Sequence, residues 1–221
     1  MGKARIHLVL MLALTFSTGI VDAVGFLGYD RVFTGNMTGN VVILGMGLSG
    51  TSGLPVLRPL LAFAGFMLGA LLAGRVLVSS AKGVWTNRTS LMLGAVTLGC
   101  LGLVGLVLVE DPTQHHSVGT VTTTVLAVVM GMQAAAARKI GVADVTTVVV
   151  TSTIVGLASE SRLAGGDGHL WGRRLLAIVG ILAGALVGAL TLAVNLWLGV
   201  LLTAVIIGAV TVIGHRTRHV A

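Results

Sequence analysis

The polar segment Phe33-Thr-Gly-Asn-Met-Thr-Gly-Asn40 is the densest group of side chains that could bind a solute. It lies between long apolar runs, where an amide or hydroxyl group without a hydrogen-bond partner costs much free energy. Asn36 and Asn40 are four residues apart, so a helix would place them on one face, with Thr34 and Thr38 close by. Their amides and hydroxyls could replace water around a solute. Alternatively, they could form hydrogen bonds between helices, with the intervening glycines as a packing motif.

Asp22 is the acidic residue whose position is most suggestive of chemistry, because it follows a long apolar stretch. Placing a carboxylate near the middle of a membrane helix costs about 2.5–3.5 kcal/mol. Such acids usually face a cavity, a partner or an ion. We therefore expect Asp22 to bind a cation or a proton. If it lies near the outer end of its helix, it could instead cap the following turn.

A second polar group lies in the C-terminal half of the chain. Gln133 takes the place of Asp22 when Met132-Gln133-Ala134 is aligned with Val21-Asp22-Ala23. Thr151 and Thr153 then follow on a short segment. A hydroxyl-rich, β-branched run is more often used for packing than for ligand binding. The sequence thus predicts an asymmetric path, with an acid in one half and a neutral amide in the other.

The elements that must position these residues are membrane helices. The chain has 221 residues, of which 55% are hydrophobic and only 10% charged, and its mean hydropathy is +1.03. Soluble domains carry about 25% charged residues, and an apolar run of about 18 or more crosses a bilayer as a helix. Eight apolar segments are present, and the second and sixth are too short to span: 6–28, 33–48, 56–79, 90–109, 118–137, 145–158, 175–194 and 196–214. The expected fold is an all-α polytopic membrane helix bundle with about six spanning helices and two short polar, re-entrant or broken helices.

The two halves of this single transmembrane domain (1–221) resemble each other, which predicts a repeat of 6–109 and 118–214. Arg58 aligns with Arg173 and Leu71 with Leu186, and the same separation of 115 residues relates six further pairs between them. If each half makes three net crossings, the second half is upside down relative to the first. Inverted repeats with discontinuous helices recur among transporters.

Basic residues set the expected orientation, because Lys and Arg mark cytoplasmic loops. Lys3 and Arg5 place the N-terminus in the cytoplasm, and Arg216 and Arg218 place the C-terminus there too. The first apolar segment also has the outline of a secretory signal, but its apolar character continues to Leu27, which favours a retained helix.

Several classes of function are not expected from this composition. The net charge of +7 is scattered over short connections, so we expect no nucleic-acid partner. His115 and His116 lie in a loop, and His215 and His219 lie in the tail, without a third ligand nearby, so we expect no metal site, and no cofactor. The motifs of soluble enzymes are missing, and no nucleophile–base pair is visible, so we do not expect an enzyme.

Two segments of the first half resemble the signature of the YoaK-like family: Gly19-Ile-Val-Asp-Ala23 and Arg31-Val-Phe-Thr-Gly-Asn-Met-Thr-Gly-Asn40. Three later segments are similar to later parts of that signature: Gly131-Met-Gln133, Val150-Thr-Ser-Thr153 and Trp171-Gly-Arg-Arg-Leu-Leu176. The resemblance covers nearly the whole chain, although Ser152 stands where the family pattern has glycine. It implies a bacterial multi-pass membrane protein with six spans and supplies no substrate.

Two functions remain open on these residues. The first is a small-solute transporter or channel of the bacterial inner membrane, in which the two short segments meet near the middle of the bilayer. The second is a non-transporting scaffold or assembly protein whose polar motifs lock helices together. Glycine stripes at four-residue spacing predict helix contacts and could also join two protomers as a homo-oligomer: Gly65, Gly69, Gly180, Gly184 and Gly188.

Overall fold

The computed structural model describes residues 2–29, 31–51, 53–110, 116–141 and 150–218, and this part of the chain is helical. Six of its helices are long and apolar enough to cross a membrane, which confirms the expected helix bundle. The elements are α1 (Lys3–Gly28), α2 (Met37–Leu48), α3 (Leu57–Leu77), α4 (Asn87–Val109), α5 (His116–Ile140), α6 (Val150–Ser159), the 3-10 turn η1 (Arg162–Ala164), α7 (Trp171–Leu192) and α8 (Leu196–Thr217).

Local sequence signals explain where several helices begin. Asn36 caps α2, since its side chain accepts a hydrogen bond from the backbone N–H of Gly39. Thr86 caps α4 in a reciprocal arrangement: the Thr86 hydroxyl accepts the backbone N–H of Thr89, and the Thr89 hydroxyl accepts the backbone N–H of Thr86. Pro59 is accommodated in the first turn of α3, where helix N–H groups have no partner within the helix.

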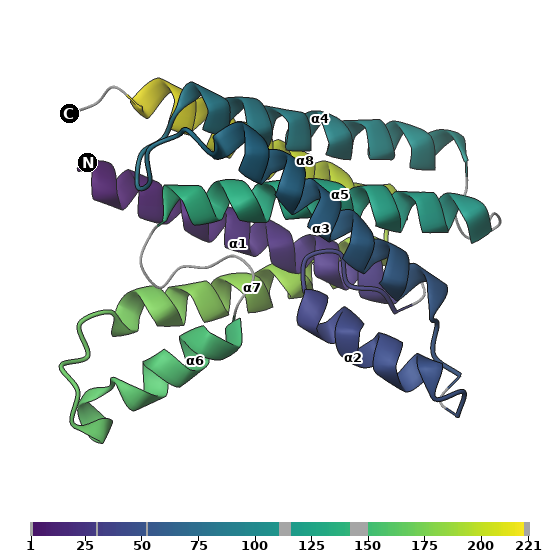
Figure 1. The fold of residues 1–221 in the computed structure, drawn as a ribbon, viewed down its shortest axis with the longest axis horizontal. Helices are drawn as coiled ribbons and strands as arrows, with labels where there is room; N and C mark the ends of the chain where they lie inside the picture. The colour runs from purple at the N-terminus through teal and green to yellow at the C-terminus, as the bar shows by residue number, and fades with distance from the viewer. Residues whose placement is uncertain (1, 30, 52, 111–115, 142–149, 219–221) are drawn as a thin grey trace.

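The six long helices run roughly along one common direction (Figure 1). Both chain ends lie at one end of this bundle, together with the connection between α3 and α4 and that between α6 and α7. The connections from α2 to α3 and from α7 to α8 lie at the opposite end. The helix packing crosses between the halves: α1 packs on α7 and α8, α5 packs on α3 and α4, and α4 packs on α8.

Glycines set the two closest helix crossings. A Cβ added at Gly184 of α7 would lie closer than 3.0 Å to the carbonyl oxygen of Phe16 in α1, and one added at Gly69 of α3 would lie equally close to that of Val128 in α5. Such a separation leaves no room for a side chain, so these positions require glycine. The expected helix-contact role of Gly69 and Gly184 is thereby confirmed, with partners inside the same chain.

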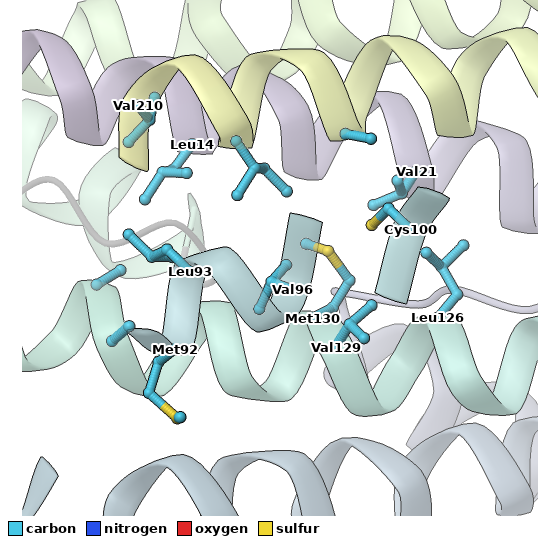
Figure 2. Packing of buried hydrophobic residues seen from close by; sticks show 14 of the residues in the cluster. Leu14, Val21, Met92, Leu93, Val96, Cys100, Leu126, Val129, Met130 and Val210 are labelled. Atoms are coloured by element: carbon cyan, nitrogen blue, oxygen red, sulfur yellow. The ribbon is translucent and has the colours of Figure 1, made fainter. Parts of the chain in front are cut away.

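The buried apolar core lies between α1, α4, α5 and α8. Figure 2 shows Leu14, Cys100, Met130 and Val210 within it, and all four side chains are almost completely buried. Outward-facing leucines are well exposed in contrast, for example Leu98, which is 70% exposed. An exposed apolar surface of this kind suits contact with lipid hydrocarbon chains.

The two short helices begin near the middle of the bundle's length and run toward opposite ends of it (Figure 1). α2 packs on α3, and α6 packs on α7. Residues 33–36 form a loop, so the expected helix over 33–48 begins only at Met37. α6 is described from Val150, and the first five residues of the expected segment 145–158 lie outside the described residues. Within the described ranges α2 and α6 do not pack directly on each other, although residues of both line one cavity.

Candidate functional site

The carboxylate of Asp22 anchors the loop that leads into α2. Its Oδ1 accepts three backbone N–H groups, from Thr34 at 3.0 Å, Gly35 at 2.7 Å and Asn36 at 3.2 Å. These N–H groups immediately precede the first turn of α2, where the helix dipole also favours a negative charge. Asp22 is 8% exposed. One of its two oxygens therefore has a structural role in folding the chain back toward the middle of the bundle.

Asn40 fixes the other side of the same loop. Its amide nitrogen donates to the carbonyl oxygen of Phe33 at 2.6 Å, and its amide oxygen accepts the N–H of Phe33 at 2.9 Å. The side chain is fully buried. The amide nitrogen also donates to Met37 Sδ at 3.7 Å. Asn40 is therefore bonded within the loop and α2 and does not face a solute.

A cavity of about 690 Å³ lies beside Asp22, and both short helices contribute to its wall. α1 contributes Thr18, Asp22 and Phe26, and α7 contributes Ile181. The remaining lining residues come from the α2 loop and helix and from the start of α6: Phe33, Gly35, Asn36, Thr38, Gly39, Val42, Ile43, Val150 and Thr151. The wall thus combines one acid with amide and hydroxyl groups, aliphatic side chains and two aromatic rings.

The structure brings together four of the eight candidate residues at this cavity: Asp22, Asn36, Thr38 and Thr151. The other four lie elsewhere. Thr34 is fully buried and donates its hydroxyl to the carbonyl oxygen of Val21, and Asn40 holds Phe33. Thr153 lines a separate cavity of about 270 Å³ between α6 and α7. Gln133 is buried in α5.

Gln133 reaches the cavity indirectly. Its Nε2 donates to the hydroxyl of Thr18 at 3.1 Å and lies 3.4 Å from the carbonyl oxygen of Leu14. Its Oε1 is buried and has no hydrogen-bond partner in the described part of the chain. The amide therefore supports a wall residue rather than facing the cavity itself.

The helix packing pairs the two halves differently around Asp22 than the sequence alignment that placed Gln133 opposite it. A Cβ at Gly19 of α1 would meet the Ile181 carbonyl of α7, and one at Gly131 of α5 would meet the Phe66 carbonyl of α3. These two contacts correspond, because Ile181 and Phe66 are 115 residues apart, as in the sequence alignment. Aligning Gly19 with Gly131 then places Ala134, rather than Gln133, opposite Asp22.

Among the wall residues that sequence reasoning missed are Thr18, Phe26 and Phe33. A signal for the first two was available, because residues four before and four after Asp22 share its helix face. Phe33 reaches the cavity through the loop, where no periodicity applies. For metals, the described residues contain no group of three or more His, Cys, Asp or Glu side chains able to hold an ion.

Six apolar spans around a partly polar interior define an integral, multi-pass membrane protein. Residues 10–213 match the family described as "Protein of unknown function (DUF1275)", and the chain belongs to that family. It is 28% identical over 162 residues to the UPF0700 transmembrane protein YoaK of Bacillus subtilis (strain 168), which covers 72% of this chain and 69% of that relative. The resemblance to the YoaK-like family is thereby confirmed. No solved structure matches.

Proposed function

We propose that the chain is a small-solute transporter or channel of the bacterial inner membrane. The observation that carries this proposal is the cavity of about 690 Å³, whose wall includes the N-terminal ends of both short helices and the buried acid Asp22. Short helices that begin within a bundle beside a cavity are a feature of transporter binding sites. The volume lies within the range of about 300–1,000 Å³ that is typical of small-molecule sites. No catalytic step forms part of this proposal.

We also propose that the halves 6–109 and 118–214 are inverted repeats. The packing of helices from one half on helices of the other supports this, because α1 contacts α7 at Gly184 just as α5 contacts α3 at Gly69. The equivalent glycines are 115 residues apart, as in the sequence alignment. The opposite directions of α2 and α6 from the middle of the bundle (Figure 1) agree with a two-fold axis in the membrane plane.

Both chain ends belong to the cytoplasm in this proposal, because the bundle end that carries them also carries most of the basic residues near helix ends, including Arg75, Arg88 and Arg138. We expect a membrane-impermeant maleimide to label Thr51→Cys in intact spheroplasts and Lys82→Cys only after permeabilisation. Both side chains are exposed, and replacing Cys100, the one cysteine, by alanine provides the background. Labelling of Lys82→Cys in sealed spheroplasts would contradict the orientation.

The transport test uses the purified full chain in liposomes with radiolabelled sugars, amino acids, amines and inorganic ions. We expect at least one solute class to enter faster than in protein-free liposomes. Thr38→Trp fills the cavity from α2 and should reduce this uptake to the protein-free level. Val41→Trp places the same ring on an exposed α2 position outside the cavity and should leave uptake unchanged.

Equal uptake by the two tryptophan variants would remove the cavity from the transport path. Folded wild-type protein that moves nothing across the panel would favour the second candidate function, a non-transporting scaffold or assembly protein. One observation favours that candidate, since Asp22 Oδ1 and both the oxygen and the nitrogen of the Asn40 amide bond to loop backbone. We do not extend either proposal to a homo-oligomer through the glycine stripes, because Gly69 and Gly184 already contact helices of the same chain.

A further inference from the structure

The cavity wall carries one charged side chain among the described residues, and its charge is negative. The Oδ1 of Asp22 receives all three loop N–H groups, whereas its Oδ2 has no hydrogen-bond partner within the described ranges. Asp22 is more than nine-tenths buried and lines the cavity. A buried carboxylate that lacks a cationic partner is costly, so a bound cation at the cavity would be stabilised there.

Two aromatic rings lie on the same wall. Phe26 and Phe33 stack with their ring centroids 4.8 Å apart and their planes at 25°, and both line the cavity with Asp22. The face of an aromatic ring attracts an organic cation, and a carboxylate beside such rings strengthens the preference. Val42, Ile43 and other aliphatic side chains complete the wall, so an inorganic ion would leave much of it without a suitable contact.

We propose that the ligand of this cavity is a small organic cation, a protonated amine or quaternary ammonium group attached to an apolar body. The ammonium group would lie against Asp22 Oδ2 and the aromatic pair, and the apolar body against the aliphatic wall. This inference names the class of solute for the transport function proposed above, and the transport of that solute rests on the proposed function. Binding can be measured independently of transport.

An anionic ligand does not suit the same wall. Helix N-termini attract anions through their free N–H groups, but the loop N–H groups just before α2, those of Thr34, Gly35 and Asn36, already donate to Asp22. In the first turn of α2, the N–H of Gly39 donates to the Asn36 side chain. An anion would also be repelled by the carboxylate. The cavity therefore discriminates by charge, and the discrimination depends on Asp22.

The test is isothermal titration of the purified full chain in a neutral detergent. The cationic probes are tetramethylammonium, tetraethylammonium and benzyltrimethylammonium, with benzenesulfonate and benzyl alcohol as the anionic and neutral counterparts. We expect saturable binding of benzyltrimethylammonium, weaker binding of tetramethylammonium because it lacks the apolar body, and none of benzenesulfonate. Absence of saturable binding by all three cations, or equal binding of benzenesulfonate, would overturn the inference.

Two variants separate a binding role from a structural one. Asp22→Asn keeps an oxygen for the loop N–H groups but removes the charge, and should weaken benzyltrimethylammonium binding by about tenfold or more. Phe26→Leu keeps an apolar side chain and should weaken it by about threefold to tenfold. Phe63→Leu on α3, half-buried and outside the cavity, is the matched control and should bind like the wild type.

Unchanged cation affinity in folded Asp22→Asn would also overturn the inference. The two proposals fail separately. Cation binding without transport in liposomes would leave the ligand class standing and reject the transport function. Transport of sugars or anions without any cation binding would reject the ligand class and leave the transport function standing.

Discussion

Gly184→Ala is expected to destabilise the protein although it adds one methyl group. The new Cβ would lie closer than 3.0 Å to the carbonyl oxygen of Phe16, so α1 and α7 must move apart along their contact. Overpacking of this kind costs about 3 kcal/mol, whereas the better helix propensity of alanine returns only about 1 kcal/mol. We therefore expect the free energy of unfolding to fall by about 2 kcal/mol. A lower thermal midpoint in detergent, followed by size-exclusion chromatography, measures the loss.

Gly180→Ala is the matched control, one turn earlier on the same helix. Its added Cβ would meet the Leu12 carbonyl oxygen at 3.9 Å, an ordinary van der Waals distance. The higher helix propensity of alanine should then outweigh any cost of packing the added methyl group, and the thermal midpoint should stay unchanged or rise. A loss of stability in Gly180→Ala as large as that in Gly184→Ala would show that the crossing does not depend on the close backbone approach.

The membrane fold was predictable from the sequence because hydrocarbon thickness sets the length of each span. Apolar runs located all six long helices, and the short length of the segment 33–48 identified it as too short to span. The glycine stripes predicted close contacts. They did not predict which helix lies opposite, because Gly184 contacts α1 of the other half and nothing in the local pattern encodes that choice.

The candidate site was only partly predictable. Asp22 was identified because an acid in an apolar helix is costly, and it does line a cavity. Asn36 and Asn40 were expected to share one helix face, but the helix begins at Met37 and Asn36 is its cap. Asn40 turns back to hold the backbone of Phe33. A loop closed by side-chain-to-backbone bonds has no periodic signature, so spacing alone could not reveal it.

Gln133 shows a further limit of the sequence. An alignment of three residues placed it opposite Asp22, whereas the Gly19 and Gly131 contacts shift the correspondence by one residue. On a helix one residue is a rotation of about 100°, which is enough to move a side chain from a cavity into a helix interface. Gln133 accordingly bonds to Thr18 instead of lining the wall.

Asp22→Ala is expected to be strongly destabilising. It leaves the N–H groups of Thr34, Gly35 and Asn36 without their acceptor, and each such loss costs about 1–3 kcal/mol. Cavity water can compensate part of this, so we expect a net loss of about 3–5 kcal/mol in the free energy of unfolding. The yield of monodisperse protein in detergent and its thermal midpoint measure the effect.

Asp22→Asn separates the two roles that the carboxylate combines. The amide oxygen can still accept the three N–H groups, and only the charge assistance is lost, at a cost of about 1 kcal/mol. The variant should therefore purify as a folded protein while its uptake in liposomes falls to the protein-free level. Collapse of Asp22→Asn to the same extent as Asp22→Ala would mean that the negative charge itself holds the α2 loop in place. Folded Asp22→Asn with wild-type uptake would reduce Asp22 to a loop anchor, because a residue whose charge can be removed without loss of transport does not select the solute.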